Sequence, residues 1–112
     1  MAIRIVATPT FERNAKKIAK KDRLLHVDLQ TLFELLSDNP KAGVYLGNNC
    51  YKLRLKNSSS RSGKSGGYRV ISYYYDQQEI VGLLTVYSKS VRDNIFENEI
   101  DELIVELANT IH

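Results

Sequence analysis

Residues 50–89 read CYKLRLKNSSSRSGKSGGYRVISYYYDQQEIVGLLTVYSK. Three runs in this stretch are rich in β-branched and aromatic residues, at 50–56, 68–75 and 80–88, and they predict three neighbouring strands. A Ser/Gly-rich segment separates the first two runs, and the polar residues 76–79 form a turn between the last two. The stretch therefore predicts the larger part of a β-sheet.

Side chains alternate along the first of these strands. One face of the strand carries three cations and the other carries apolar residues: Lys52, Arg54 and Lys56 against Tyr51, Leu53 and Leu55. The last strand is almost continuously apolar, as expected of a strand that is covered on both faces. One face of the sheet is thus predicted to carry a positively charged region.

The rest of the chain predicts one further strand and the helices that cover the sheet. A short strand at 3–8 precedes Thr8-Pro9, which is typical of a helix cap followed by proline at the first helical position. Apolar residues at helical spacing predict one helix ending near residue 22 and a second at 25–38, which stops before Pro40. Residues 41–49 form an irregular connection with a brief strand at 44–46, and an apolar stripe at 100–111 predicts a C-terminal helix.

These elements predict an α+β fold. A small, twisted, mostly antiparallel sheet of about four strands is covered by an N-terminal helical hairpin, with a C-terminal helix besides. At 112 residues with 43% hydrophobic residues, the chain is expected to form a single domain over residues 1–112. The start of the chain lacks the apolar run of a signal peptide or spanning helix, so we expect a cytoplasmic protein that does not enter a membrane.

Charge is distributed unevenly along the chain. Seven Lys/Arg and no Asp/Glu lie at 41–75, whereas two Lys/Arg and eight Asp/Glu follow from residue 76 onward. A concentrated positive field favours binding of polyanions through phosphate contacts. A solvated basic face without a ligand is the alternative interpretation.

Other chemistries have little support in the sequence. His26 and His112 are isolated from any acid or Cys at metal-ligand or proton-relay spacing. Cys50 begins a strand with no His nearby, which favours a buried thiol over a nucleophile. The string Gly63-Lys64-Ser65 lacks the upstream glycine and the following helix of a nucleotide-binding loop. No metal or cofactor is therefore expected.

The cationic surface suits cleavage of RNA without a metal. Such a reaction needs a base for the attacking 2′-hydroxyl, cations for the charge that develops on phosphorus, and an acid for the leaving 5′-oxygen. Crowded ammonium groups lower the pKa of a lysine, which lets it act as the base. The expected surface holds five cations and one tyrosine: Lys52, Arg54, Lys56, Arg69, Lys89 and Tyr87.

The order of elements and three segments of the chain resemble the RelE/ParE superfamily of toxins from type II toxin-antitoxin modules. These segments are Tyr51-Lys52-Leu53-Arg54-Leu55, the run GYRVISYY at 67–74, and Thr85-Val86-Tyr87-Ser88-Lys89. The Ser/Gly/Lys loop before Gly66-Gly67 and the ending Tyr-Ser-Lys look most like the HigB branch. The resemblance covers essentially the whole chain.

The resemblance implies a ribosome-dependent mRNA endonuclease that leaves a 2′,3′-cyclic phosphate and is held inactive by a cognate antitoxin. It implies catalytic roles for Lys52 and Arg54 as proton-transfer groups, for Arg69 in stabilising the transition state, and for Lys89 as a further cation. Tyr87 stands in for a tyrosine that RelE members carry farther along the chain. We also expect RNA or ribosome contacts at Lys56, Arg61, Lys64, Tyr73 and Arg92.

The implied partners are the ribosome, mRNA and an antitoxin containing a helix-turn-helix domain. Two other functions stay open at this point. A ParE-like toxin would poison DNA gyrase, and a non-catalytic module would bind RNA or protein without cleavage. Inhibited supercoiling with intact mRNA would indicate the first, and salt-sensitive RNA binding without growth arrest would indicate the second.

Overall fold

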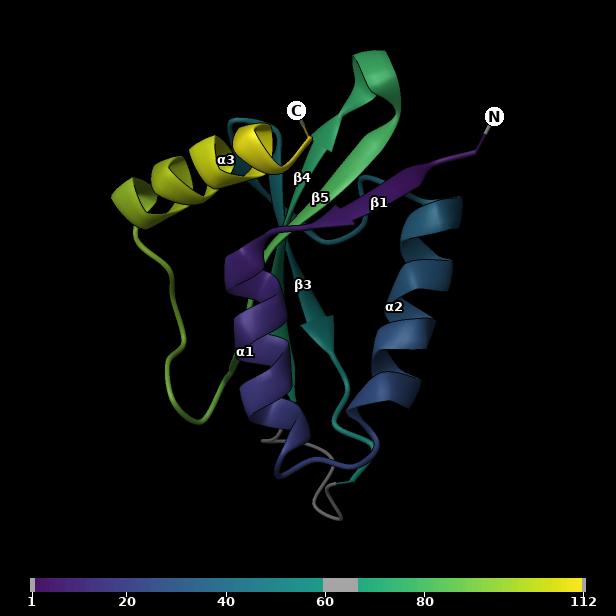
Figure 1. Ribbon diagram of the computed structural model, residues 1–112, viewed down its shortest axis with the longest axis vertical. Coiled ribbons are helices and arrows are strands. Elements are labelled where there is room, and N and C mark those ends of the chain that lie inside the picture. The colour runs from purple at the N-terminus through teal and green to yellow at the C-terminus, as the bar shows by residue number, and fades with distance from the viewer. Residues whose placement is uncertain (1, 60–66, 112) are drawn as a thin grey trace.

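The computed structural model describes residues 2–59 and 67–111 (Figure 1). Within these ranges the chain forms five strands, three α-helices and one short 3-10 turn. In chain order they are β1 (Arg4–Ala7), α1 (Pro9–Ala19), α2 (Leu25–Asp38), β2 (Val44–Gly47), β3 (Cys50–Leu55), β4 (Tyr68–Tyr75), η1 (Asp76–Gln78), β5 (Ile80–Ser88) and α3 (Glu97–Ile111).

The strands form one sheet in the order β1-β5-β4-β3-β2. The contacts of β4 with β3 and β5, and of β2 with β3, are antiparallel, while β1 pairs with β5 in parallel, with Arg4 opposite Ile80. The predicted α+β fold with a mostly antiparallel sheet is confirmed. The strand count differs from about four because the brief run at 44–46 extends to Gly47 and pairs with β3.

Local chemistry explains where the first helix begins. The hydroxyl of Thr8 accepts a hydrogen bond from the Phe11 amide at 3.0 Å, which satisfies one of the free N–H groups of α1. The same hydroxyl donates to the carbonyl of Leu84 at 2.8 Å. Thr8 is fully buried, and it therefore fixes the start of α1 against β5.

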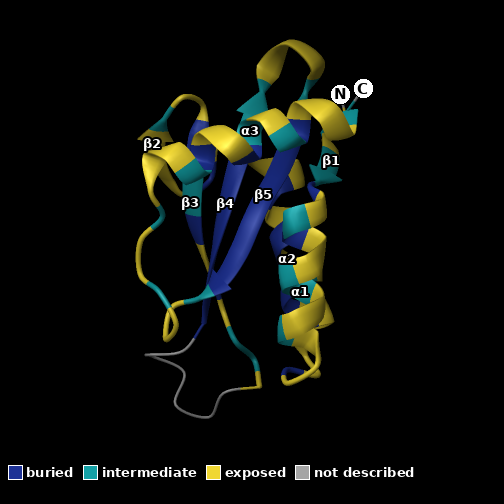
Figure 2. Cartoon of the chain, turned by 60° about the vertical axis from the view of Figure 1, so that its left-hand side comes forward, coloured by how far each residue is buried: buried dark blue, intermediate teal, exposed yellow. Residues whose placement is uncertain are grey.

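Two separate cores lie on the two faces of the sheet (Figure 2). On one face, Phe11 of α1 and Leu25, Leu32 and Leu36 of α2 pack on the strands. On the other face, Ile100, Leu103 and Leu107 of α3 pack on β3, β4 and β5. Leu107 lies so close to β5 that a Cβ added to Gly82 would lie 2.2 Å from its Cδ2 atom. The glycine therefore allows α3 to contact the sheet directly.

The α3 helix crosses only one end of its face of the sheet, as both Figure 1 and Figure 2 show. The strands β3, β4 and β5 continue beyond it toward the end where β3 and β5 run out. This uncovered end of the sheet contains the candidate site. None of the helices in the described part of the chain has the length and apolar character needed to cross a membrane.

Candidate active site

The register of three strands brings Arg54, Arg69 and Tyr87 side by side. Arg54 on β3 is paired with Arg69 on β4, and Arg69 is paired with Tyr87 on β5. Directly paired residues share a face of the sheet, with their Cβ atoms about 5 Å apart. We call these three residues the cationic row.

The cationic row lies on the same face as α3, toward the end of the strands away from Gly82, and Tyr87 also belongs to the core under α3. At the covered end, Cys50, Tyr73 and Gly82 occupy the corresponding positions on the three strands. Cys50 is fully buried in the α3 core, and burial, together with the charge of Asp101, raises the pKa of its thiol to about 11. A thiol of this kind is a packing residue at neutral pH, as the sequence predicted.

Arg69 is the central residue of the row and is only 7% exposed. Its guanidinium donates one hydrogen bond, from Nη1 to the carbonyl of Tyr68 at 3.2 Å, and no carboxylate lies within ion-pair distance of it among residues 2–59 and 67–111. A guanidinium has five N–H donors. Arg69 is therefore a largely desolvated cation that no described carboxylate neutralises.

The other predicted cations lie around the row at different distances. Lys52 is on the same face of β3 as Arg54, one pair of residues closer to α3, and is partly buried opposite Ile71. Lys56 follows the end of β3 and is exposed. Lys89 follows the end of β5, is exposed, and donates its backbone N–H to the carbonyl of Gly67 at 3.2 Å. The structure therefore places Lys52 beside the row and Lys56 and Lys89 at its rim.

Tyr87 is 8% exposed, and its hydroxyl donates to the carbonyl of Asp93 at a long 3.5 Å. Burial raises the pKa of this phenol above its usual value, although the positive charges of Arg92 and Arg69 act in the opposite direction. Tyr87 consequently keeps its proton at neutral pH. A protonated phenol in a row of arginines can donate a proton to a leaving oxygen.

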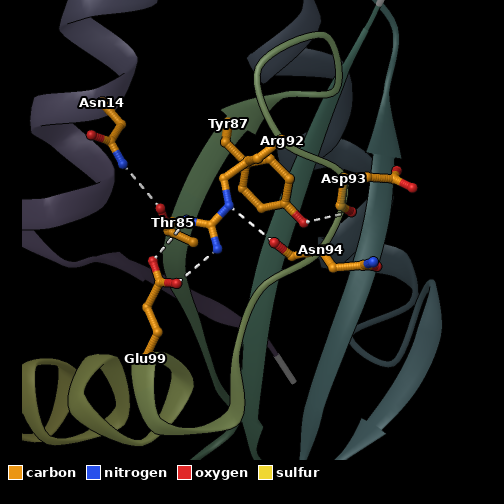
Figure 3. Close-up of polar contacts among 7 residues, drawn as sticks. All are labelled: Asn14, Thr85, Tyr87, Arg92, Asp93, Asn94 and Glu99. Carbon is orange, nitrogen blue, oxygen red and sulfur yellow. Dashed lines mark hydrogen bonds and ion pairs between the residues drawn. The ribbon is translucent and has the colours of Figure 1, made fainter.

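Arg92 joins Tyr87 to the start of α3 (Figure 3). Its guanidinium lies 5.2 Å from the centre of the Tyr87 ring and forms two hydrogen bonds with Glu99, at 2.8 and 3.0 Å. Its Nε donates to the carbonyl of Asn94 at 3.0 Å. The hydrogen bond to Glu99 raises the pKa of Arg92. Arg92 was predicted to contact RNA; in the structure its guanidinium is paired with Glu99, and the RNA contact stays a prediction.

Three other predicted RNA contacts lie away from the row or outside the described residues. Tyr73 shares the face of the row but packs against the α3 core, beside Ile104 and Leu107. Arg61 and Lys64 lie outside the residues that the structure describes. The roles predicted for all of these residues stay predictions.

Two buried carboxylates hold the segment that follows β3: Asp22 in the link before α2 and Asp28 in the first turn of α2. Asp28 accepts hydrogen bonds from the backbone N–H of Ser58 at 2.9 Å and from its hydroxyl. Asp22 accepts from the Tyr68 hydroxyl at 2.6 Å, from the Leu24 N–H at 3.0 Å and from the Ser59 hydroxyl. Both acids are about 95% buried, at 5% and 4% exposure. They fix both ends of the connection from β3 to β4 next to the row.

The pKa values of this pair reflect that network. Burial alone would raise the pKa of Asp22, but the hydrogen bonds from Ser59, Tyr68 and Leu24 outweigh it and the pKa is lowered. Burial, together with the hydrogen bond to Asp22, raises the pKa of Tyr68. Asp22 is therefore ionised and Tyr68 neutral near neutral pH.

Sequence reasoning missed Asp22, Asp28 and Glu99. Asp22 lies in a polar link and Asp28 on a helix face that both look solvated in the sequence. Their hydrogen-bond partners Tyr68 and Ser58 lie 46 and 30 residues away. Glu99 is seven residues from Arg92, in an acidic helix whose polar residues read as a wet face. Asp28 and Glu99 each adjoin the apolar stripe of a helix, which was the usable signal for them, whereas Asp22 lies in the link before α2 and gave none.

Comparison with known proteins shows the family of this chain. The model of the RelE toxin of the RelE/RelB toxin-antitoxin system matches residues 3–112, and the chain belongs to this family. A solved structure of the E. coli toxin RelE, a double arginine-to-alanine mutant in the free state, has a similar fold. The TM-score is 0.57 at 20% sequence identity, and 100% of each chain is covered. As a member of a toxin family, the chain has an antitoxin as its expected partner.

Proposed function

We propose that this toxin is a ribosome-dependent endoribonuclease that cuts translated mRNA and so inhibits translation and growth. The observation that carries the proposal is the cationic row, with the buried Arg69 at its centre and no described carboxylate within ion-pair distance of Arg69. Burying a cation without a partner is costly. An anionic ligand such as an RNA phosphodiester removes that cost when it binds.

The reaction that fits the row is attack of the RNA 2′-hydroxyl on its own phosphate. A bond forms between the 2′-oxygen and phosphorus, and the bond from phosphorus to the 5′-oxygen breaks. The products are a 2′,3′-cyclic phosphate and a 5′-hydroxyl. Arg54 and Arg69 neutralise the charge that develops on the phosphate oxygens, and their side-by-side pairing provides donors on two strands.

Two further groups provide the proton transfers. Tyr87 is protonated at neutral pH and adjoins Arg69, so it donates a proton to the leaving 5′-oxygen. Lys52 shares the face of Arg54, and in its neutral amine form it accepts the proton of the 2′-hydroxyl. Lys89 and Lys56 at the rim of the row attract the polyanion.

Primer extension on a defined mRNA tests the proposal, with the protein alone and with translating ribosomes. Stops within codons, seen only with ribosomes, are the expected result. R69A should reduce the cleavage rate by about 10²- to 10³-fold, the usual cost of removing one donor to the transition state. R54A, at an exposed position, tests the row without affecting the core. K41A removes one exposed charge away from the row and should cut like the parent protein.

Intact message under both conditions would contradict the nuclease. In that case, inhibition of gyrase supercoiling would indicate a ParE-like toxin. The absence of both mRNA cleavage and gyrase inhibition would indicate a binding module. R69K keeps the charge but loses the fork of the guanidinium, so partial activity in R69K and none in R69A would separate electrostatics from geometry. A melting temperature equal to that of the parent protein excludes misfolding as the cause of a loss.

A further inference from the structure

A hollow of about 280 Å³ lies beside Tyr87, between α1, the end of β5 and the segment that leads into α3. Its lining combines apolar walls with a few polar groups and includes Asn14, Ile18, Thr85, Tyr87, Val91 and Arg92. We call it the Asn14 hollow. Its volume lies just below the range of about 300 to 1,000 Å³ in which drug-sized ligands bind, so it suits a single planar ring system.

The Asn14 hollow is continuous with the cationic row through Tyr87. This residue lines the hollow and is also the β5 member of the row, opposite Arg69 on β4. Thr85, two positions earlier on β5, points to the same face and lines the hollow as well. Neighbouring strands are only about 4.8 Å apart. A nucleotide whose phosphate lies at Arg69 therefore has its own base, or the base of the next nucleotide, within reach of the hollow.

The side-chain amide of Asn14 is held in place by β5 (Figure 3). Its Nδ2 donates a hydrogen bond to the Thr85 hydroxyl at 3.0 Å, and Thr85 is only 4% exposed. Within residues 2–59 and 67–111 this is the one hydrogen bond of the Asn14 side chain. An amide has two N–H donors and an oxygen that accepts two hydrogen bonds. Asn14 is partly exposed, so one N–H and the carbonyl oxygen are left for a ligand.

The charged groups that line the hollow largely neutralise each other. Arg92 and Glu99 both line it, and they form an ion pair with two hydrogen bonds. Lys17 lines it too, but its side chain is exposed to solvent. An uncharged ring therefore fits the interior of the hollow better than a phosphate does, because a phosphate placed there would be removed from water without a free cation.

We propose that the Asn14 hollow binds the base of a message nucleotide next to the cleaved bond, and that Asn14 selects adenine there. The inference rests on the proposed function and adds to it a determinant of base preference. The amide of Asn forms two hydrogen bonds with adenine, one donated to a ring nitrogen and one accepted from the exocyclic amine. The bases of single-stranded RNA are free to turn into such a pocket, where Ile18 and Val91 provide apolar walls for the ring.

Thr85 has a different part in this arrangement from Asn14. Its hydroxyl accepts the Asn14 amide proton, and its burial on β5 leaves it no surface of its own for a base. Thr85 is therefore a positioning residue, which fixes the plane of the amide. Removing its hydroxyl should weaken the preference for adenine without removing the amide that makes it.

The test is an NMR titration of the labelled protein with four 2′-deoxyribose homotrimers, d(AAA), d(GGG), d(CCC) and d(TTT). These trimers carry phosphates and bases but lack the attacking 2′-hydroxyl, so they are not cleaved. Resonances of the Asn14 side-chain amide and of the Ile18 and Val91 methyl groups report on the hollow and should shift. The Kd of d(AAA) should be at least about fivefold lower than that of each other trimer, as one bidentate pair provides.

Three variants separate selection from folding. N14A should bind the four trimers with equal affinity, because the selecting amide is gone. T85V retains the amide but removes the acceptor that orients it, so the preference for d(AAA) should fall to an intermediate value. N109A removes an exposed Asn of α3 that does not line the hollow, and it should keep the preference of the parent protein. Equal melting temperatures exclude misfolding as the cause of a loss.

Equal affinity of the parent protein for the four trimers would overturn the inference, and so would a preference for adenine that N14A retains. A preference for another base would overturn the choice of adenine. Unmoved resonances of Asn14, Ile18 and Val91 would show that the trimer binds elsewhere and would overturn the subsite itself.

This titration is independent of cleavage. If no message were cut with or without ribosomes, the proposed function would fail while the measured base preference would stand. If R54A and R69A lost cleavage but the parent protein bound all four trimers alike, the function would hold and the Asn14 hollow would not be its base subsite.

Discussion

The two ends of one sheet face are built on the same three strands and have opposite properties. At one end, Cys50 and Gly82 lie under α3 and are sealed by apolar side chains. Toward the other end, Arg54, Arg69 and Tyr87 form a row in which Tyr87 still packs against the α3 core and Arg54 is exposed. The strand backbone continues from one end to the other. The side chains alone decide which end is closed and which is open to an anion.

The position of α3 follows from this difference. The absence of a side chain at Gly82 lets Leu107 approach the sheet, whereas Arg54 and Arg69 at the other end would leave charge beneath an apolar helix. A helix that buries Ile100, Leu103 and Leu107 gains most on the apolar end. The pair of Arg92 and Glu99 then marks the boundary between the two ends.

Breaking the closed end should give the largest effect on stability. L107A removes a side chain that is 2% exposed, so the free energy of unfolding should fall by about 2 to 5 kcal/mol. Urea denaturation followed by circular dichroism measures it. V105A, on the same helix at 60% exposure, should change stability by less than about 0.5 kcal/mol. Equal losses in the two variants would show that α3 is not seated as described.

Removing the charge of Asp22, which holds the segments next to the open end, should lower the free energy of unfolding by less. D22N leaves the Tyr68 hydroxyl and the Ser59 hydroxyl without their charged acceptor, and the free energy of unfolding should fall by about 1 to 3 kcal/mol at pH 7. The matched control is D38N, because Asp38 is exposed at the end of α2. Unfolding curves at several pH values measure both variants.

The pH dependence of this loss has a defined sign. The pKa of Asp22 is lowered in the folded protein, so its stabilisation is complete above the unfolded value of about 3.9 and is lost as the pH falls through the folded value. The difference between the parent protein and D22N should therefore shrink below about pH 4. A difference that stays constant down to pH 2 would show that Asp22 does not carry the network as an anion.

The smallest effect is expected at the boundary between the two ends. The side chains of Arg92 and Glu99 are 32% and 36% exposed, so R92Q should lower the free energy of unfolding by less than about 1 kcal/mol. R92Q should nevertheless raise the pKa of Tyr87, because the positive charges of Arg92 and Arg69 both stabilise the phenolate and Arg92 has the larger effect. A titration of the labelled tyrosine by NMR measures it. R92K retains the charge and should leave the pKa nearer that of the parent protein, and an unshifted Tyr87 in R92Q would refute the contact.

Local patterns predicted much of this molecule. The cap at Thr8 and the bounds of α2 follow from signals within a few residues, and the alternation in β3 placed Lys52 and Arg54 on one face. Pairing across strands was not visible in the sequence. The row needs Arg54, Arg69 and Tyr87 in register, which is set by two antiparallel contacts.

The parts that sequence could not provide are long-range polar contacts. Asp22, Asp28 and Glu99 each look like a solvated acid, because helical periodicity says which side of a helix is apolar but not what lies beside its polar edge. Their burial or pairing depends on Ser58, Tyr68 and Arg92, which reach them only in the folded chain. The parallel pairing of β1 with β5 likewise joins residues that are distant in sequence.

The parallel contact of β1 with β5 also has a consequence for how the chain is synthesised. It joins Arg4 to Ile80, so the first strand has no place in the sheet until the last strand has left the ribosome. Contacts between residues so distant in sequence form late and slowly. The row itself spans Arg54 to Tyr87. The row and the sheet around it can therefore assemble only after β5 has been synthesised, and a chain that stops before Tyr87 has neither.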